Sequence, residues 1–449
     1  MERNNNPLEI KTYLSENFGV SPRVIDFVSE VEAGIDDQLQ ARDEMAALHQ
    51  YRVIRAMQNV HLSDRHFHPS TGYGYDDEGR EATEKIFAEV FGAEAALVRP
   101  HISSGTHAIA LCLYGVLRPG DELLSISGDP YDTICTFIGA HGEESGAGTL
   151  ADFGVRYHQI ELANGGTFDT AAIMAAITDR TKMVYIQRST GYSWRKAITL
   201  DAIAAICQKI KAQWPEVIIF VDNCYGEFLD AQEPAAVGAD LMAGSLIKNP
   251  GGGLAPTGGY VAGRADLVAL CANRLAAPGI GGETGATLGI ARTFLQGFFQ
   301  APMVVSQAMK TAILVGAVYR ALGFDVCPAV DDYRSDIIQS VKLGNPEAVK
   351  TFCRAVQEAA PVDAFVTPEP WDMPGYDVPV IMAAGAFIQG SSIELSADAP
   401  MRKPYIVYFQ GGLTHDHGKL GLLLSLQRLI DSGFITLGSG HDQWTIGTD

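Results

Sequence analysis

The sequence predicts an α/β protein with a mixed, mostly parallel β-sheet and helices on both faces. Two observations lead to this fold class. Between about residues 95 and 245, short apolar segments of strand length alternate with amphipathic segments of helix length. One of the short segments, residues 217–221, is apolar throughout, as expected of a central parallel strand that is covered on both faces. In such folds, ligands bind beside the carboxyl ends of the strands.

The expected elements follow one another along the whole chain. Helical patterns cover most of residues 7–60, and a turn-rich loop at 70–80 leads into a helix that ends at Gly92, which suits a left-handed helix cap. We expect strands at 95–99, 122–126, 156–160, 182–186, 217–221, 239–245, 258–263, 336–341 and 405–409. We expect one helix that ends near residue 117. We expect further helices at 131–139, 169–177, 200–212, 265–275, 303–322, 346–358 and 419–430.

The order of these elements predicts three parts. They are an N-terminal helical arm (1–60), a large domain (61–305) and a smaller α/β C-terminal domain (306–449) that includes a bridging helix.

The composition is that of an ordinary globular protein and limits its partners. Of 449 residues, 47% are hydrophobic and 19% are charged. The net charge of −20 argues against nucleic acid or an anionic membrane as a partner. The seven cysteines are scattered and form no C-x-x-C pair, which favours reduced thiols and a cytoplasmic location. We also expect no signal peptide and no membrane-spanning segment, because the longest apolar run, residues 312–318, is short.

The segment from His61 to His68 contains three histidines and Asp64, so a metal site has to be considered. The segment has no helical His-x3-His pair, and no other cluster of ligands is evident in the sequence. A structural role or a place in a substrate pocket is therefore favoured, and we expect no metal.

Lys248 ends an apolar stretch and stands just before the glycine-rich residues 251–253. Two interpretations are open. The aliphatic stem of the lysine could be buried while its ammonium reaches water, which is the more common arrangement for a lysine considered alone. Alternatively, burial could lower the pKa of the amine, which would then react with a carbonyl group.

Three further features stand near the carboxyl ends of expected strands. Residues 103–106 (Ser-Ser-Gly-Thr) lead from a strand into a helix, and their amides and hydroxyls suit an anion, although such turns are also ordinary caps. Asp222 closes the fully apolar strand, where an unpaired carboxylate would be costly. Tyr131 begins a helix. Together with Lys248, these features match the needs of pyridoxal 5′-phosphate: a phosphate site, an aromatic partner, a carboxylate for the pyridine nitrogen and an amine for the aldehyde.

With these motifs in this order, the chain resembles the aspartate-aminotransferase-like, fold-type I pyridoxal-phosphate enzymes over roughly residues 60–440. Within them it is similar to the Cys/Met-metabolism branch, and most of all to the bacterial methionine γ-lyase-like proteins that are often called aluminium resistance proteins. The resemblance implies that Lys248 binds the cofactor, that Tyr131 stacks on its ring and that Asp222 faces its pyridine nitrogen. It assigns the remaining cofactor contacts to Ser103, Ser104, Gly105, Thr106, Asn223 and Ser245.

Two segments depart from the pattern of that branch. Gly72-Tyr73-Gly74 stands where the branch has Tyr-x-Arg, so the arginine that would reach a neighbouring subunit's phosphate is absent. Tyr73, Tyr75 or the loop at 279–287 could supply this contact instead. Residues 187–192 (Gln-Arg-Ser-Thr-Gly-Tyr) replace Glu-Ser-Pro-Thr-Asn-Pro, which changes contacts to the cofactor ring and to the substrate carboxylate.

The resemblance implies a carbon–sulfur lyase that carries out β- or γ-elimination on cystathionine, cysteine or methionine. Lys248 would also move the substrate's α-proton, Tyr73 or Tyr75 would assist the leaving group, and Arg402 would bind the substrate carboxylate. The active site would be shared within a homodimer or homotetramer. Two alternatives remain open: an aminotransferase, decarboxylase or aldolase with the same cofactor, and a catalytically weak, stress-related ligand-binding protein.

Overall fold

The computed structural model describes residues 7–142, 146–163, 165–373, 376–437 and 444–446. Packing divides the chain into two units, which are described separately below. Unit 1 comprises residues 1–42, 307–332 and 338–449, and unit 2 comprises residues 43–306 and 333–337. The first 42 residues therefore belong to the same unit as the C-terminal sheet. The division falls within two long helices, α3 (Asp36–Asn59) and α10 (Ala291–Ala321).

Unit 2 is built on a seven-stranded sheet with the order β1-β7-β6-β5-β4-β2-β3. Only β7 runs against its neighbours β1 and β6, so the sheet is mixed but mostly parallel. The strands are β1 (Ala95–Arg99), β2 (Glu122–Ser125), β3 (Arg156–Gln159), β4 (Thr181–Gln187), β5 (Ile218–Asp222), β6 (Leu241–Ser245) and β7 (Gly259–Gly263). The helices are α4 (Glu78–Phe91), α5 (Gly105–Val116), α6 (Asp132–Ile138), α7 (Thr170–Ala176), α8 (Leu200–Gln213) and α9 (Ala265–Leu275).

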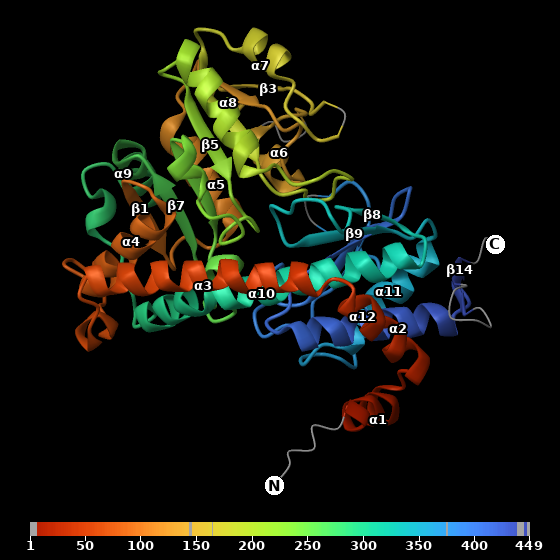
Figure 1. Cartoon of the computed structure of the whole chain (residues 1–449). Helices are drawn as coiled ribbons and strands as arrows, with labels where there is room; N and C mark the ends of the chain where they lie inside the picture. The colour runs from red at the N-terminus through yellow and green to blue at the C-terminus, as the bar shows by residue number, and fades with distance from the viewer. Residues whose placement is uncertain (1–6, 143–145, 164, 374–375, 438–443, 447–449) are drawn as a thin grey trace. The chain divides into compact units, whose positions relative to one another are not determined.

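Helices cover both faces of this sheet (Figure 1). On one face, α5 and α9 pack against the inward side chains of the central strands, among them Phe220 and Val261. On the other face, Phe91 of α4 lies 5.1 Å from Tyr260 of β7, measured between ring centroids. Every residue of β5 is buried, which confirms the prediction of a central strand covered on both sides.

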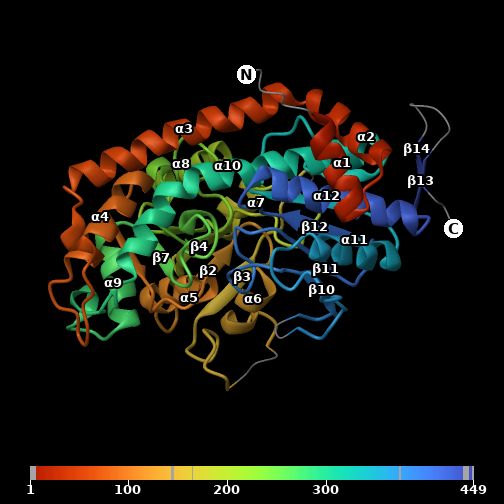
Figure 2. The same cartoon turned by 90° about the horizontal axis from the view of Figure 1, so that it is seen from below.

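Unit 1 contains a five-stranded antiparallel sheet with the order β10-β11-β12-β9-β8. Its strands are β8 (Asp325–Cys327), β9 (Ile338–Lys342), β10 (Val380–Ala383), β11 (Ser396–Pro400) and β12 (Ile406–Gln410). The helices α11 (Pro346–Glu358) and α12 (His415–Asp431) lie side by side, as Figure 2 shows. The unit also includes α1 (Pro7–Phe18), α2 (Pro22–Ala33) and the hairpin of β13 (Ile435–Leu437) and β14 (Trp444–Ile446).

The structure confirms the predicted fold class and corrects two details. First, α10 begins at Ala291, well before the expected residue 303, and it contains Pro302 in its interior. Second, α10 is long and apolar enough to cross a membrane by length and composition, whereas no such segment was expected. Its most apolar window is 83% buried within the protein, which is typical of a core helix.

Candidate active site

The predicted site residues meet at the carboxyl edge of the large sheet. Asp222 is the last residue of β5, and Ser245 is the last residue of the adjacent strand β6. On the other side of β5, Gln187 ends β4 directly opposite Asp222. Lys248 follows β6 by three residues, in a tight turn. This is the edge at which ligands bind in doubly wound sheets.

Gly105 lies where three of the predicted segments come close together: the turn at 103–106, the end of β5 and the end of β6. A Cβ atom on this glycine would lie 3.2 Å from Cys224 Sγ and 3.3 Å from Ser245 Cβ, so the first turn of α5 approaches the ends of both β5 and β6. Ser104 caps α5, and its hydroxyl accepts a hydrogen bond of 3.1 Å from the amide of His107. The amide of Ser103 donates to Nδ1 of His107 over 3.1 Å. Burial lowers the pKa of His107, which favours the neutral ring that this bond requires.

Asp222 is almost fully buried and is held by two neighbours. The amide of Cys224 donates to its Oδ1 over 3.1 Å, and the hydroxyl of Tyr185 lies 3.4 Å from its Oδ2. Burial raises the pKa of Asp222, and the positive charge of Lys248 and the bonds from Cys224 and Tyr185 act against this rise. The carboxyl is thus fixed in place at the end of the sheet and suited to share a proton with a basic ring nitrogen.

Lys248 lies among acidic groups and beside an aromatic ring. Its Nζ is 4.1 Å from the centroid of Tyr225, which is a favourable position for a cation over a ring. Burial lowers the pKa of Lys248, but Cys224, Tyr225, Asp222 and Glu227 raise it more, so the net pKa lies above the ordinary value. The expectation of a depressed pKa is therefore wrong for the protein without cofactor. Burial alone was considered in that expectation, and the surrounding acids were not visible in the local sequence.

Tyr131 stands at the beginning of α6 and is oriented by a residue far away in the sequence. The side-chain carbonyl of Gln187 accepts a hydrogen bond of 2.7 Å from the amide of Tyr131. The ring of Tyr131 lies 5.7 Å from the ring of Tyr192, at an angle of 46°. Both contacts come from residues 187–192, the segment that departs from the pattern of the resembling branch. The residues that replace the branch's usual segment therefore hold Tyr131, which is predicted to stack on the cofactor, in its position.

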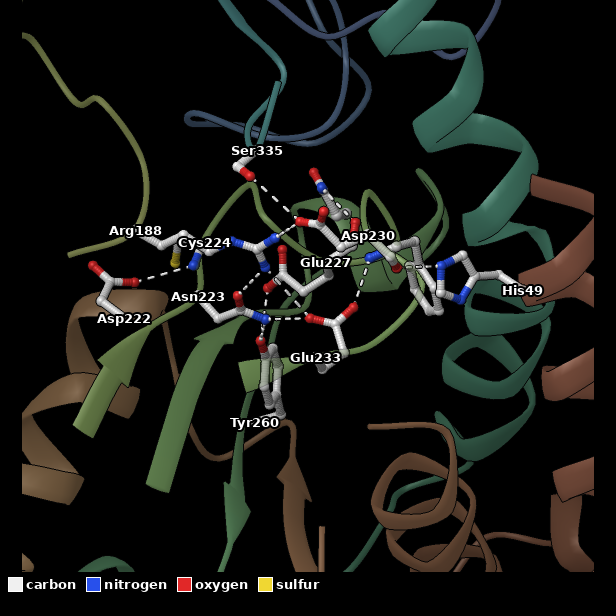
Figure 3. A network of polar contacts seen from close by, with 12 residues as sticks. His49, Arg188, Asp222, Asn223, Cys224, Glu227, Asp230, Glu233, Tyr260 and Ser335 are labelled. Carbon is white, nitrogen blue, oxygen red and sulfur yellow. Dashed lines mark hydrogen bonds and ion pairs between the residues drawn. The ribbon is translucent and has the colours of Figure 1, made fainter. Parts of the chain in front are cut away.

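Next to Asp222 in the sequence, Asn223 belongs to a buried network of polar contacts around Arg188 (Figure 3). The guanidinium donates to Asn223 Oδ1 over 2.7 Å, forms an ion pair with Asp230 and lies 3.6 Å from the carboxylate of Glu233. Asn223 in turn donates to Glu233 over 2.9 Å. Its side chain is thereby engaged within the protein, and its predicted role at the cofactor stays a prediction.

Glu227 is a fully buried acid beside this network. Its Oε1 accepts a hydrogen bond of 2.8 Å from the hydroxyl of Tyr260, while its buried Oε2 has no hydrogen-bond partner in the described part of the protein. Burial raises the pKa of Glu227 to about 8, and Glu233 contributes to this rise. The side chain is therefore mainly protonated at neutral pH.

The Glu227→Gln variant should show how this acid affects stability. Because the pKa of Glu227 is raised from 4.5 to about 8 in the folded state, its stabilising effect is complete below pH 4.5 and is lost as the pH rises to about 8. Urea unfolding of the cofactor-free protein should show wild-type stability falling relative to the variant over this range, by on the order of a few kcal/mol. Glu81→Gln, on the exposed face of α4, should follow the wild type. Parallel curves for Glu227→Gln and the wild type would contradict the protonated state.

Tyr73 and Tyr75 lie at the surface of unit 2. Their side chains are 67% and 59% exposed, and their rings stack with centroids 5.5 Å apart. The loop that carries them contacts the loop at 279–287, because the amide of Gly285 donates to the carbonyl of Tyr73 over 2.9 Å. The two segments that the sequence suggested for a cross-subunit contact therefore form one surface.

Two buried arginines fix these loops. Arg80 donates to the carbonyls of Gly74, Glu283 and Gly285, over distances of 2.5 to 3.2 Å. Arg99 donates to the carbonyls of Gly282 and Thr284 and forms an ion pair with Glu84. The backbone of both loops is thus tied to α4 and β1.

The other predicted positions lie elsewhere. Arg402 is exposed and follows β11 in unit 1, so its role in binding substrate stays a prediction. His66 is buried, and its ring bonds to the amide of Ser63 over 3.0 Å, which indicates a structural role. Sequence reasoning missed Gln187, Tyr225 and Glu227. The signals were a polar residue at the end of an apolar strand, and an acid and an aromatic residue just after Asp222.

The fold and this site define an aspartate-aminotransferase-like protein of the pyridoxal-phosphate-dependent fold type I. The pyridoxal-5′-phosphate-dependent protein YhfS of Escherichia coli shares the fold, with a TM-score of 0.57 and 19% identity over 85% of this chain and 96% of that chain.

Within this class, the chain belongs to the methionine gamma-lyase family, whose family model matches residues 24–430. It is 50% identical to the uncharacterised protein YnbB of Bacillus subtilis, over 90% of this chain and 96% of that protein. Among solved structures, it is similar to the carbon-sulfur lyase of Clostridium novyi, which is described as involved in aluminium resistance. That similarity has a TM-score of 0.90 and 46% identity, and covers 94% of this chain and 100% of the other. The L-methionine gamma-lyase of Pseudomonas putida is 32% identical over 46% of this chain and 44% of its own length.

Proposed function

We propose that this protein is a pyridoxal-phosphate-dependent carbon–sulfur lyase that carries out β- or γ-elimination on a sulfur amino acid. The observation that carries the proposal is the meeting of Lys248, Asp222 and the Gly105 turn at one edge of the sheet, in a chain of the methionine gamma-lyase family. The names of the solved carbon–sulfur and cystathionine beta-lyase relatives support the reaction class.

The residues present fit this cofactor. Gly105 leaves room where a Cβ atom would press on Cys224 and Ser245, and the amides of α5's first turn and the hydroxyl of Ser245 suit a phosphate. Asp222 would hold a proton between its carboxylate and the pyridine nitrogen, and Tyr131 would cover a face of the ring. When bound, pyridoxal phosphate withdraws electrons from the α-carbon of the substrate, which makes the α-proton acidic.

Lys248 would both bind the cofactor and move protons. Its raised pKa means that Nζ holds a proton when the site has no cofactor, and the neighbouring carboxyl of Asp222 favours this charge. Nζ must lose that proton before its lone pair can bond to a carbonyl carbon. With the cofactor and substrate bound, Nζ would take the proton from the substrate's α-carbon and would hold it while the thiol leaves.

We also propose that the active site is completed by a neighbouring subunit in a homodimer or homotetramer. The exposed, stacked pair of Tyr73 and Tyr75 supports this proposal, because it lies at the surface on a loop whose backbone is bound by Arg80. One of these hydroxyls would then reach the leaving group or the phosphate in the neighbour's site.

Two arginines, Arg334 and Arg402, are candidates for binding the substrate carboxylate. Variants of each should show which of them does so. Arg334 is buried, and it belongs to unit 2 together with Lys248. Its neighbours in sequence hold it there, since Ser335 donates to Asp230 and Asp336 accepts from the amide of Thr190 over 2.8 Å. We expect Arg334→Lys to raise KM about tenfold or more with a smaller change in kcat, because lysine cannot grip a carboxylate through two parallel bonds.

The same measurement on Arg402→Lys provides the comparison. An exposed arginine should give a smaller rise in KM than Arg334. A larger rise for Arg402→Lys would assign the carboxylate to Arg402, as the resemblance implies, and would contradict the expectation for Arg334.

The decisive experiment for the function is a titration of the cofactor-loaded protein with L-cystathionine, L-cysteine and L-methionine. Visible absorbance would report binding, and the products would be identified. Release of a 2-oxo acid, ammonia and a thiol from one of these substrates is expected. Transfer of the amino group without thiol release would indicate an aminotransferase instead, and cofactor binding without turnover of any amino acid would indicate a ligand-binding protein.

A further inference from the structure

Three metal-ligating side chains meet around α6, outside the residues used above. In the part of the chain that the structure describes, the ligand atoms of Asp129, Cys135 and His141 lie within 4.8 Å of one another. Asp129 Oδ2 and His141 Nε2 are 3.7 Å apart. Cys135 is buried, whereas the other two side chains are exposed. The three residues are regularly spaced as Asp-x5-Cys-x5-His.

The geometry of this group is close to that of a zinc site. Zinc bonds of 2.0–2.3 Å in a tetrahedral arrangement place neighbouring ligand atoms about 3.3–3.6 Å apart. The observed carboxylate–imidazole distance of 3.7 Å is near this range, and the thiol sulfur lies within 4.8 Å of both other ligand atoms. A set of one thiolate, one imidazole and one carboxylate suits Zn²⁺ or Co²⁺, whereas Mg²⁺ and Ca²⁺ prefer oxygen ligands alone.

The carboxylate is also oriented as metal ligands usually are. The hydroxyl of Tyr157 lies 3.1 Å from Asp129 Oδ1, which leaves Oδ2 facing His141. Such a bond to the non-ligating oxygen fixes a carboxylate for coordination. The thiol of Cys135 donates to the carbonyl of Pro130 over 3.2 Å, so the sulfur is held near the same loop.

We propose that Asp129, Cys135 and His141 bind one borderline divalent cation such as Zn²⁺, with a fourth coordination position left for water. On binding, the Cys135 thiol loses its proton to solvent, and the sulfur exchanges its bond to the Pro130 carbonyl for a bond to the metal. The ion joins the residues before and after α6 and so closes a short loop that contains Tyr131.

This position gives the site a second property, which rests on the proposed function. Tyr131 is the residue predicted to stack on the cofactor, and its amide is bound to Gln187 at the sheet edge. A metal that restricts this loop should therefore change the affinity for pyridoxal phosphate, and the cofactor should change the affinity for the metal by the same factor.

The test is a titration of the reduced, full-length protein, freed of cofactor, with Co²⁺. The expected result is stoichiometric binding with a thiolate-to-cobalt charge-transfer band and intense visible bands of a four-coordinate ion. Cys135→Ser should lose the charge-transfer band, and Asp129→Asn and His141→Ala should each weaken binding at least tenfold. Asp129 and His141 are exposed, so their variants should fold, which melting curves would verify.

Two matched control variants distinguish binding at the proposed metal site from nonspecific binding of Co²⁺ to surface side chains. His158 is 61% exposed and lies 3.4 Å from a carboxylate oxygen of Glu122, much as His141 lies near Asp129. Among the described residues, His158 belongs to no group of three metal-ligating side chains. Cys327 is the least buried of the seven cysteines. His158→Ala and Cys327→Ser should bind Co²⁺ like the wild type.

Three results would overturn the proposal. They are the absence of stoichiometric binding, a charge-transfer band that persists in Cys135→Ser, or an equal loss of affinity in His158→Ala. Because this titration uses no cofactor and no substrate, it is independent of the lyase assay. Equal pyridoxal-phosphate affinities with and without bound Zn²⁺ would overturn the link to Tyr131 alone.

Discussion

Replacing Lys248 with alanine should lower kcat by roughly 10²–10⁴-fold or more, because the variant loses the amine that moves the α-proton. The variant should also lose the covalent attachment of the cofactor. Borohydride reduction followed by mass measurement would show one added cofactor per wild-type chain and none in Lys248→Ala. The steady-state rate of thiol release would give the change in kcat.

Lys209→Ala is a suitable control for this experiment. Lys209 is exposed on α8, so its variant should keep both the added mass and the turnover of the wild type. If Lys248→Ala retained thiol release at a comparable rate, or if the added mass mapped to another lysine, the proposed mechanism would be wrong.

Replacing Arg188 with methionine should destabilise the protein by about 3–5 kcal/mol. The guanidinium is fully buried and lies between Asp230, Glu233 and Asn223. Methionine fills much of the volume but leaves the buried acids without their cation. The free energy of unfolding, measured with urea at pH 7, would give the size of the loss.

The loss of stability in Arg188→Met should depend on pH. Burial raises the pKa of Glu233 to about 7, and Arg188 opposes this rise. Without Arg188 the pKa rises further, so stability is lost over a wider range as the pH increases, and the penalty should be larger at pH 8 than at pH 5. Arg264→Met removes ion pairs to Asp240 and Asp266 at the surface and should cost less than about 1 kcal/mol. Similar losses for both variants would contradict the role assigned to the buried network.

The sequence predicted the strands and helices of the large domain well because its signals are local, whereas it did not predict β8, β10 and β11 of the C-terminal sheet. Alternating strand and helix patterns, and the apolar residues 217–221, depend on neighbouring positions only, and the structure has these elements within a few residues of their expected places. The helix α10 begins twelve residues before its expected start at 303, and Pro302 lies inside it although prolines usually mark helix boundaries. A proline inside a helix loses one backbone hydrogen bond, and here the surrounding core tolerates that loss.

The site was predictable only in part, for a related reason. The order of the turn at Gly105, Asp222 and Lys248 indicated their roles, and strand topology then placed them at one edge. In contrast, Gln187 contacts Tyr131 across 56 positions, and the acids that raise the pKa of Lys248 act through space. Such contacts depend on the packed structure, and no periodic pattern in the sequence reports them.

The hydrogen bonds that Arg80 and Arg99 donate to the two surface loops have a consequence for assembly. Arg80 and Arg99 hold the backbone of both loops within a single chain, so the stacked Tyr73 and Tyr75 are ordered before any second chain arrives. If a neighbouring subunit binds there, little conformational entropy remains to be lost at that point of contact. If the proposed assembly forms, a change at Arg80 should weaken it even though the Arg80 side chain is buried within its own chain.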